Sequence, residues 1–436
     1  MSNRRQFLLT TAAAGIGYWV AGGVQAKASR SPNERIAFAS IGIEGKGQSD
    51  SDDAGRSGDM VAICDVDDNK LAAAGQHRFK KAKKFNDFRK MLDQMGKSID
   101  AVTVSTPDHV HAIAAAMALR MKKHCFVQKP LTHSIHEARV LGQLAVQNGV
   151  ATQMGNQGTA NNGLRKAAAA VKAGMLGTLK EVHVWTNRPI WPQGENRPAP
   201  SPPPANLHWD LWLAGAPTRP YGKEAYHPFK WRGWWDFGCG ALGDMACHTF
   251  NMPFAALDLR DPTSVQAETS GHNKDSYPKW SVISFEFPAN ATRGPVKAYW
   301  YDGGKRPPME LFDGHNVENS GALIVGSKGK LYSPGDYCDH FEVLGKAQVP
   351  EVEFVRSPGH FAEWVRAIKG GEPAMSNFPN YAGPLTETIL LGNLAVWVAA
   401  SGKGEKVLWD PKELKVTNIS GLENIVQPVY RKGYSL

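Results

Sequence analysis

Short apolar runs alternate with helix-like segments over residues 35–155. The segment 136–147, for example, carries apolar residues at helical spacing. Continuous apolar strands that alternate with helices are typical of a parallel sheet with helices on both faces. This part of the chain therefore predicts a doubly wound α/β sheet. The runs expected to form its strands are residues 35–43, 60–66, 101–105, 125–128 and 150–154.

The pattern changes after about residue 155. Strand-like segments near 280–287, 296–301 and 322–325 have no helices between them, which favours an antiparallel sheet. Residues 185–235 hold seven of the 13 tryptophans and ten of the 28 prolines. The run 197–204 within them predicts a polyproline II excursion or arm. Further elements are expected as a strand at 179–186 and helices at 163–173, 360–368 and 384–399.

The first 28 residues have the organisation of a secretory signal. Arg4 and Arg5 precede Phe7 and Leu8, an apolar stretch follows to about residue 20, and small residues stand near 24–28. The paired arginines resemble a twin-arginine signal, which exports folded proteins through the Tat machinery. The sequence thus predicts a periplasmic protein, with an N-terminal membrane anchor as the alternative. The expected division is 1–28 signal, 33–155 first domain and 156–436 second domain.

Composition narrows the functional class. With 436 residues, 42% hydrophobic and 21% charged, the chain is globular and long enough for two or three domains. The surplus of 50 basic over 41 acidic residues shrinks once the signal is removed. With no long basic run, it does not favour a nucleic-acid partner. Five cysteines without a CxxC pair predict free, buried thiols and no zinc site.

A glycine-rich turn follows the first expected strand. Glycines at such a turn let a backbone approach a pyrophosphate, and the next helix supplies N–H groups. Asp65 ends the second expected strand 23 residues after Gly42, about the spacing of a ribose-binding carboxylate. Asp65 and its acidic neighbours would repel a 2′-phosphate, so NAD is expected and NADP is less favoured. The expected contacts of this turn are Gly42, Ile43, Gly45 and Gly47.

Five motifs together resemble the Gfo/Idh/MocA oxidoreductase family, which includes glucose–fructose oxidoreductase and inositol dehydrogenase. The resemblance implies a Rossmann domain and a C-terminal α/β domain with an open, mostly antiparallel sheet. It also implies a homo-oligomer, dimer or tetramer, that pairs through that sheet. Two positions depart from the family pattern: Gln128 replaces a glutamate, and Glu44 stands where glycine is frequent. The motifs are residues 42–47, 64–67, 105–111, 128–130 and 243–248.

The resemblance implies a catalytic role for Lys129 at the end of a strand. It also places Asp244 and His248 at the substrate; they are four residues apart and share one helical face. We expect His248 to take the substrate proton, Lys129 to bind the same oxygen, and Asp244 to orient the sugar and the histidine. Without the resemblance, the residues favour an ordinary structural role, with Asp244 in a first helical turn and His248 in the core, and no third ligand predicts a metal.

Other residues are expected around these groups. Thr106, Pro107 and His109 are assigned to a loop near the nicotinamide. Gln157, Asn187 and Arg188 are candidate polar contacts of a sugar. Of the clustered tryptophans, most are expected in the core or a subunit interface. Trp191 and Trp235 are the candidates to face a sugar ring.

The sequence therefore predicts an exported NAD-dependent oxidoreductase that acts on a hydroxyl of a sugar, glycoside or cyclitol. Because free NAD is not expected outside the cytoplasm, the cofactor is expected to be tightly bound and regenerated in place. The first alternative is redox-neutral cleavage of a glycoside through transient ring oxidation. The second alternative is a non-catalytic sugar-binding protein, which the departures at Gln128 and Glu44 favour.

Overall fold

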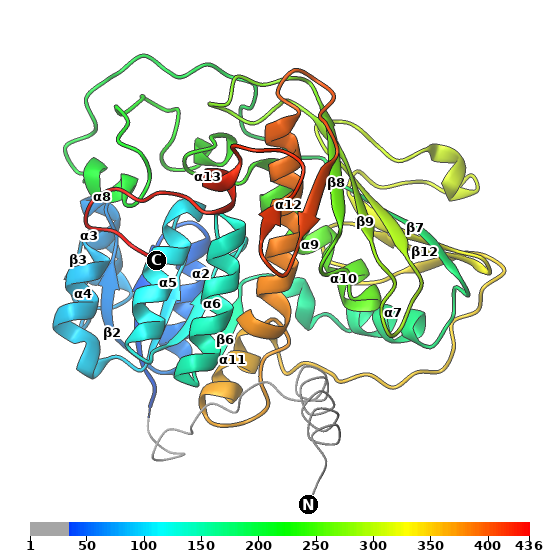
Figure 1. Ribbon diagram of the computed structural model, residues 1–436. Helices are drawn as coiled ribbons and strands as arrows, with labels where there is room; N and C mark the ends of the chain where they lie inside the picture. The colour runs from blue at the N-terminus through cyan, green and yellow to red at the C-terminus, as the bar shows by residue number, and fades with distance from the viewer. Residues whose placement is uncertain (1–34) are drawn as a thin grey trace, which may run out of the picture.

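The computed structural model describes residues 35–436 and contains two sheets that lie side by side (Figure 1). The predicted signal, residues 1–28, lies outside the described residues. The first sheet belongs to the N-terminal part of the chain and the second to the C-terminal part. This arrangement confirms the predicted fold class of a Rossmann sheet followed by an α/β domain.

The first sheet has six parallel strands in the order β3-β2-β1-β4-β5-β6. All four residues of β4 are buried, as expected for a strand covered on both faces. Strands β2 and β3 are added on one side of β1, and strands β4 to β6 on the other. Ligands of such sheets bind at the carboxyl ends of the strands, beside the boundary between β1 and β4. The strands are β1 (Ala37–Ile41), β2 (Asp59–Cys64), β3 (Lys83–Phe85), β4 (Ala101–Val104), β5 (His124–Val127) and β6 (Thr152–Met154).

Five helices connect these strands. Helix α6 begins with a capping box, in which the Ser134 side chain and Glu137 satisfy each other's backbone N–H groups. The expected loop at His109 is instead the first turn of α5, because the chain turns helical directly after Pro107. The helices are α2 (Lys46–Ser57), α3 (Asp68–His77), α4 (Phe88–Met95), α5 (Asp108–Arg120) and α6 (Ile135–Asn148).

The second sheet has nine strands in the order β13-β12-β11-β7-β10-β9-β8-β14-β15. Only the pair β7–β10 is parallel, and the other neighbours are antiparallel. Strand β9 alternates buried and half-buried residues, the pattern of a sheet with one face in the core. The strands are β7 (Leu179–Trp185), β8 (Ser264–Thr269), β9 (Ser281–Phe287), β10 (Val296–Tyr301), β11 (Gly321–Gly326), β12 (Gly329–Pro334), β13 (Glu342–Gly345), β14 (Val407–Asp410) and β15 (Lys415–Val416).

Helices cover the core face of this sheet, and α12 lies between the two domains (Figure 1). Helix α11 follows the second sheet in sequence but packs on the first, where Trp364 contacts Phe38 and Phe126. The C-terminal part of the chain therefore completes the core of the N-terminal domain. The helices are α7 (Asn162–Lys172), α8 (Trp209–Leu213), α9 (Gly240–Thr249), α10 (Asn251–Leu257), α11 (His360–Ile368), α12 (Gly383–Val398) and α13 (Glu423–Val426).

The proline- and tryptophan-rich segment folds back over the Rossmann domain; we call residues 189–237 the strap. It carries α8, which lies near α3 in Figure 1. The Asn206 amide donates to Asp67 Oδ1 at 2.8 Å, and the Asp68 backbone N–H donates to the carbonyl of Asn206 at 2.9 Å. The His208 N–H donates to the Val66 carbonyl at 3.0 Å. The strap is thus fastened beside the carboxyl end of β2.

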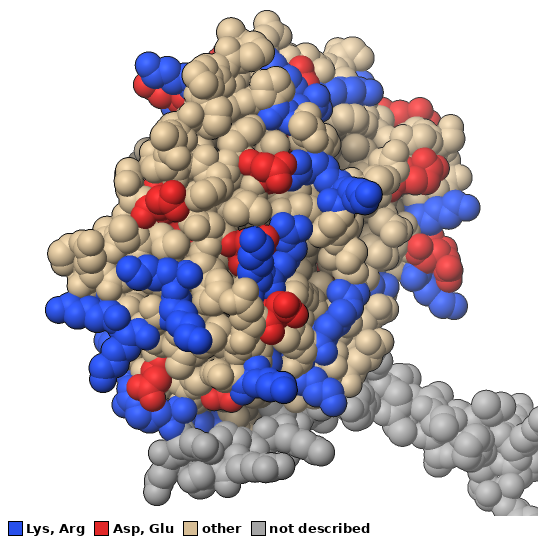
Figure 2. Space-filling view, turned by 90° about the vertical axis from the view of Figure 1, so that its left-hand side faces the viewer, with Lys and Arg blue, Asp and Glu red and all other residues tan. Residues whose placement is uncertain are grey.

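All five cysteines are free and buried, as predicted. Within residues 35–436, no helix has the length and apolarity to cross a membrane. On the face drawn in Figure 2, basic side chains outnumber acidic ones, but the two kinds are interspersed.

Candidate active site

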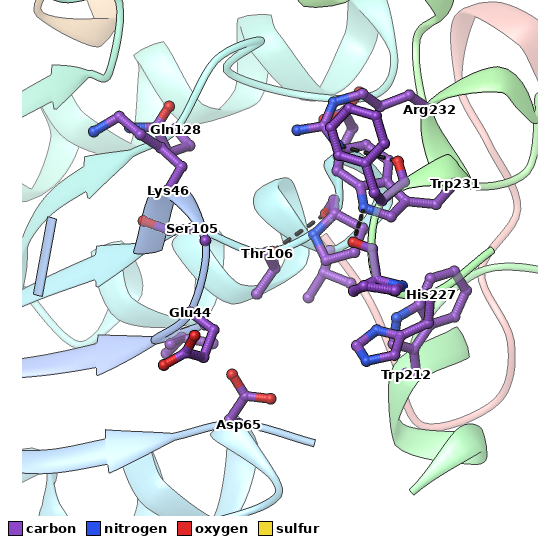
Figure 3. A pocket seen from close by; sticks show the side chains of 18 of the residues that line it. Glu44, Lys46, Asp65, Ser105, Thr106, Gln128, Trp212, His227, Trp231 and Arg232 are labelled. Carbon is purple, nitrogen blue, oxygen red and sulfur yellow. Dashed lines mark hydrogen bonds between the residues drawn. The ribbon is translucent and has the colours of Figure 1, made fainter. Parts of the chain in front are cut away.

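A cleft of about 500 Å³ lies where the carboxyl ends of the Rossmann strands meet the second domain. Its floor is formed by residues that follow β1, β2, β4 and β5, and its opposite wall by the strap and α9. Figure 3 shows Glu44, Asp65 and Thr106 on the Rossmann side, facing Trp212, His227, Trp231 and Arg232. A cleft at this point of a doubly wound sheet is the expected place for a dinucleotide.

The glycine turn between β1 and α2 is shaped for close contact with a ligand. Gly42 has φ +77°, and a Cβ there would lie 2.5 Å from the Ser105 carbonyl oxygen. Gly45 has φ +60° and no atom within 4 Å of its Cβ position, so a side chain there would project into open space. Gly45 also precedes α2 without a side-chain cap, which leaves the start of this helix for an anion.

Asp65 lines the cleft at the end of β2. Its carboxylate accepts hydrogen bonds from the backbone N–H of Ile43 at 3.2 Å and of Asp67 at 3.0 Å. Burial raises the pKa of Asp65, and these two N–H groups oppose that rise. The carboxylate is therefore held in place with lone pairs remaining for hydroxyl groups of a ligand.

Lys129 is held at the other end of the cleft by α9. Its ammonium donates to the Asp244 carbonyl oxygen at 2.8 Å and to Asp244 Oδ1 at 2.9 Å. The Arg232 Nε donates to the same carboxylate oxygen at 3.0 Å. Despite burial, the two cations hold the pKa of Asp244 well below its ordinary value. An ammonium has three N–H groups, and no residue in 35–436 accepts the third, so Lys129 can donate it to a substrate.

His248 lines the same part of the cleft, one helical turn beyond Asp244. Burial lowers the pKa of His248 well below its ordinary value, and the nearby charge of Lys129 acts in the same direction. Its ring packs edge-to-face on Tyr337 with centroids 4.9 Å apart. Its buried Nδ1 has no hydrogen-bond partner among the described residues. A neutral imidazole in this position can accept a proton from a bound hydroxyl.

Asp108 is a second carboxyl group beside these residues. It begins α5, is buried, and accepts a hydrogen bond from the Cys239 backbone N–H at 3.0 Å. Burial raises the pKa of Asp108 to about 7, although Arg232 and Lys129 oppose the shift. Two carboxyl groups of this site thus have pKa values moved in opposite directions, a feature of acid–base sites.

The structure brings most predicted site residues to the cleft. Gly42, Gly45 and Asp65 lie at one end of it. Thr106 and Pro107 lie on its floor between the two ends. The group at the other end consists of Lys129, Asp244, His248, Gln157, Arg188 and Trp191.

Two predicted cofactor residues of the glycine turn serve the scaffold instead. Ile43 does not line the cleft, because its side chain packs with Ile63 and Leu71 in the core; only its N–H reaches Asp65. Gly47 lies beneath the turn, where a Cβ would be 2.3 Å from the Gly42 carbonyl oxygen. Gly47 therefore allows close packing of helix on strand.

His109, Asn187 and Trp235 also lie outside the cleft. The ring nitrogens of His109 lie 3.1 and 2.9 Å from carbonyl oxygens of the strap, so its side chain turns away from the floor. Trp235 stacks on Tyr277 at 3.8 Å between centroids, in a separate cavity. The Asn187 side-chain oxygen accepts a hydrogen bond from the neighbouring Arg188 guanidinium, so Asn187 restricts the position of that guanidinium.

Among the cleft residues that were not predicted from the sequence are Arg232, Tyr337 and Lys46. Arg232 comes from a short 3-10 helix (Lys230–Gly233) and Tyr337 from a turn after β12, both in the second domain, and Lys46 begins α2. Of these, only Lys46 had a local signal, because it lies within the glycine turn itself. The other two reach the site through long-range folding that no spacing in the chain reveals.

Models of two oxidoreductase domains match the chain almost end to end. The NAD-binding Rossmann fold of the family matches residues 38–156, and its C-terminal alpha/beta domain matches residues 160–436. The chain belongs to the Gfo/Idh/MocA oxidoreductase family. Its N-terminal domain is the NAD-binding domain of that family, which agrees with the site described above.

Curated relatives of the Gfo/Idh/MocA chain match it only in part. One is 2,7-anhydro-N-acetylneuraminate hydratase of Escherichia coli, 29% identical over 23% of this chain and 27% of the relative. Another is inositol 2-dehydrogenase of Salmonella typhimurium, 27% identical over 29% of this chain and 37% of the relative. The matched segments thus span about a quarter to a third of the relatives' length.

A solved structure extends the likeness of the fold. The WlbA dehydrogenase of Bordetella pertussis, in complex with NADH and UDP-GlcNAcA, aligns with a TM-score of 0.60 at 18% identity. The alignment covers 86% of this chain and 99% of that one. At this identity the likeness is one of fold, and the assignment of side chains depends on the cleft itself.

The glycine turn of this Gfo/Idh/MocA protein fits NAD, including its unusual acidic residues. Glu44 faces the cleft near Asp65, where adenosine hydroxyl groups would be bound (Figure 3). The acidic side chains of α2 are occupied elsewhere: Asp52 pairs with Arg78 and Asp53 with Arg56. Lys46 lines the cleft at the start of α2, where its ammonium, paired with Asp50 at 2.6 Å, would lie near a bound pyrophosphate.

The surroundings of Gln128, which stands where the resemblance implies a glutamate, suit a neutral amide. Asp50 is buried beneath the glycine turn with a side chain only 2% exposed. Its Oδ2 accepts from Gln128 Nε2 at 2.8 Å and from Ser105 Oγ at 2.8 Å, and its Oδ1 pairs with Lys46 at 2.6 Å. A glutamate at 128 would place two carboxylates against each other. The neutral amide instead connects the phosphate turn to the backbone of Lys129, whose N–H donates to Gln128 Oε1 at 3.3 Å.

Proposed function

We propose that the protein is an exported NAD-dependent oxidoreductase that acts on a hydroxyl group of a sugar, glycoside or cyclitol. One observation carries this proposal: an ammonium with an unused N–H lies beside a neutral, buried imidazole in a cleft that fits NAD. The names of the two curated relatives agree with a sugar or cyclitol substrate.

The residues of the chain have separate roles in this reaction. Bound NAD supplies the acceptor for the hydride that leaves the carbinol carbon. Lys129 donates its third N–H to the substrate oxygen and stabilises the negative charge that develops there. His248 accepts the hydroxyl proton. Asp244 fixes Lys129 and is itself fixed by Arg232, so its role is to position the lysine more than the histidine.

We further propose that NAD is tightly bound. The support is the strap, which forms one wall of the cleft and is hydrogen-bonded to the residues after β2. A cofactor enclosed in this way leaves only when the strap opens. It would then be regenerated in place, by a second sugar or another acceptor.

Export is part of the same proposal. Arg4, Arg5 and the apolar stretch after them support passage through the Tat machinery in a folded state. Fusing residues 1–34 to a reporter protein tests it: we expect the reporter in the periplasm, and Arg4→Lys with Arg5→Lys to retain it in the cytoplasm. A fusion that remains membrane-bound would favour the anchor instead.

We also propose a homo-oligomer that pairs through the second sheet. Val282 and Tyr299 are only half-buried on β9 and β10, which leaves apolar area on that sheet. Light scattering of the purified protein measures the assembly, and a monomer at micromolar concentration would overturn this part of the proposal.

A second candidate function is redox-neutral cleavage of a glycoside. The apolar rim of the cleft favours it, because Ile190 is 66% exposed and Phe229 is 43% exposed at the entrance. Such a rim would suit an apolar group attached to the sugar. One curated relative is named as a hydratase, so the matched relatives are not all named as dehydrogenases.

The deciding experiment uses protein purified without added nucleotide. It is denatured, and the supernatant is assayed for NAD(H) and NADP(H) by mass; we expect nearly one NAD(H) per chain. The loaded protein is then offered free sugars and aryl glycosides, and the products are analysed. A keto-sugar supports the oxidoreductase, and a released aglycone without net NADH supports the second candidate. Failure to bind added NAD would overturn both.

A further inference from the structure

One cation at the Lys129 end of the cleft has no carboxylate partner among the described residues. Lys129 and Arg232 share the carboxylate of Asp244, with contacts of 2.9 and 3.0 Å. Arg188 lines the same part of the cleft but makes no ion pair with any carboxylate in residues 35–436. Two further acids lie near this end: burial raises the pKa of Asp108 to about 7, and Asp336 acts on Tyr337 but makes no ion pair with Arg188. Arg188 is therefore the cation of this group that lacks a carboxylate partner among residues 35–436.

Arg188 is positioned by contacts of its backbone and of its neighbour. It follows β7, and its carbonyl oxygen accepts from the Gly303 N–H at 2.8 Å. The N–H of Asn187 donates to Ser320 Oγ at 3.2 Å. The guanidinium donates to the Asn187 amide oxygen, a neutral acceptor, and the other N–H groups are left for a ligand.

Arg188 lines the cleft where the substrate is expected, close enough to Tyr337 to act on it. Burial and the charge of Asp336 raise the pKa of Tyr337, and the charges of Lys129 and Arg188 oppose that rise. Because Tyr337 packs on His248, Arg188 acts on the same small volume as the proposed base. A planar guanidinium with free N–H groups matches a carboxylate in shape as well as charge.

We propose that the substrate is an anionic sugar, a hexuronic acid or its glycoside, whose carboxylate is bound by Arg188. This inference rests on the proposed function for the reaction, but the recognition of charge is independent of turnover. A sugar phosphate offers a related anion, and the planar fork of Arg188 favours the carboxylate over it.

The test measures binding to the NAD-loaded full chain. Glucuronate and galacturonate are compared with glucose and galactose, their neutral counterparts, and with glucose 6-phosphate, by calorimetry. We expect a uronate to bind at least about 10-fold more tightly than its neutral counterpart. Arg188→Gln should remove most of that difference, with the uronate losing far more affinity than its neutral counterpart. Lys180→Gln is the control, because Lys180 is exposed on β7, the strand that Arg188 follows, and lies outside the cleft.

The outcomes separate this inference from the proposed function. Uronates that bind through Arg188 but are never oxidised would support the inference and overturn the dehydrogenase. Neutral sugars that are oxidised and bound as tightly as uronates would overturn the inference alone. Equal loss of uronate and neutral-sugar binding in Arg188→Gln would also overturn it, since that pattern indicates a general distortion. Tighter binding of glucose 6-phosphate than of glucuronate would replace the carboxylate by a phosphate and overturn it too.

Discussion

The two ends of the cleft are built in different ways. The end at Asp65 is made by short segments at the tips of neighbouring strands, where glycine backbone is exposed to the cleft and backbone N–H groups fix the Asp65 carboxylate. The end at Lys129 is made by side chains from β5, α9 and two distant loops. The first end depends on the backbone conformation of neighbouring strand ends. The second depends on ion pairs between side chains that come from both domains.

This difference assigns affinity for the cofactor and selection of the substrate to separate parts of the molecule. Substitutions at Gly45 should change NAD binding with little effect on the Lys129 group. Substitutions at Lys129 or Arg188 should change chemistry or selectivity in a protein that still holds NAD. The variants below test that separation.

Lys129→Met should have the largest effect. The variant removes the donor to the substrate oxygen, and we expect kcat to fall about 1,000-fold. The affinity for NAD should change by less than about twofold, because the glycine turn is intact. Steady-state kinetics and calorimetry measure the two quantities. A parallel loss of NAD binding would contradict the separation of the two ends.

Gly45→Val tests the opposite end. A branched side chain at φ +60° is strained, and here it would also enter the cleft. We expect NAD to bind about 100-fold more weakly. The matched control is Gly174→Val, which has a similar strain at φ +82° and open space around its Cβ, but lies outside the cleft. If both variants lose NAD equally, strain and not obstruction is responsible.

Gln128→Glu addresses the connection between the ends. The new carboxylate would lie against the Asp50 carboxylate, because Gln128 Nε2 now donates to Asp50 Oδ2 at 2.8 Å. We expect kcat and NAD affinity each to fall about 10-fold, because the repulsion disturbs Lys46 and the Lys129 backbone together. Adding Asp50→Asn restores a donor–acceptor pair and should recover most of the loss. No rescue in the double variant would show that the two residues act independently.

The pH dependence of kcat should show the smallest effect. Burial and Lys129 lower the pKa of His248, so the imidazole stays neutral, and able to accept a proton, to below pH 6.5. The acid limb of the kcat profile should therefore lie below that value and not at it. Rates measured from pH 5 to 8 in the loaded enzyme check this. An acid limb at or above pH 6.5 would argue against His248 as the base.

The sequence predicted the fold and the Asp65 end well because their signals are local. Buried strands appear as apolar runs, and a glycine turn and a carboxylate can be read at fixed spacing. The short strand β3 and helices α3 and α4 were not predicted; β3 is only three residues long and mostly exposed. His109 was placed in the cleft by its neighbours in the chain, although the first turn of α5 directs it to the strap.

The Lys129 end was predicted only where the family resemblance reached it. Lys129 lies in one short sequence motif, and Asp244 and His248 lie in another. All three residues line the cleft. Arg232 lies in a short 3-10 helix (Lys230–Gly233) before α9, and Tyr337 lies beyond β12, so their approach depends on how the second sheet packs on α9. Trp235 was predicted from composition alone. It stacks on Tyr277 in a separate cavity and does not line the cleft.

The buried Asp50 has a consequence for how this sequence varies among its relatives. Its carboxylate contacts position 128 directly, so the two positions cannot both be acidic without a shared proton. Changes at these sites should be inherited as a pair. Relatives with glutamate before the Lys-Pro dipeptide should lack an acid at the position of Asp50, and those with an acid there should carry an amide or another neutral residue. On this expectation, the glutamine at 128 accompanies the buried acid at position 50.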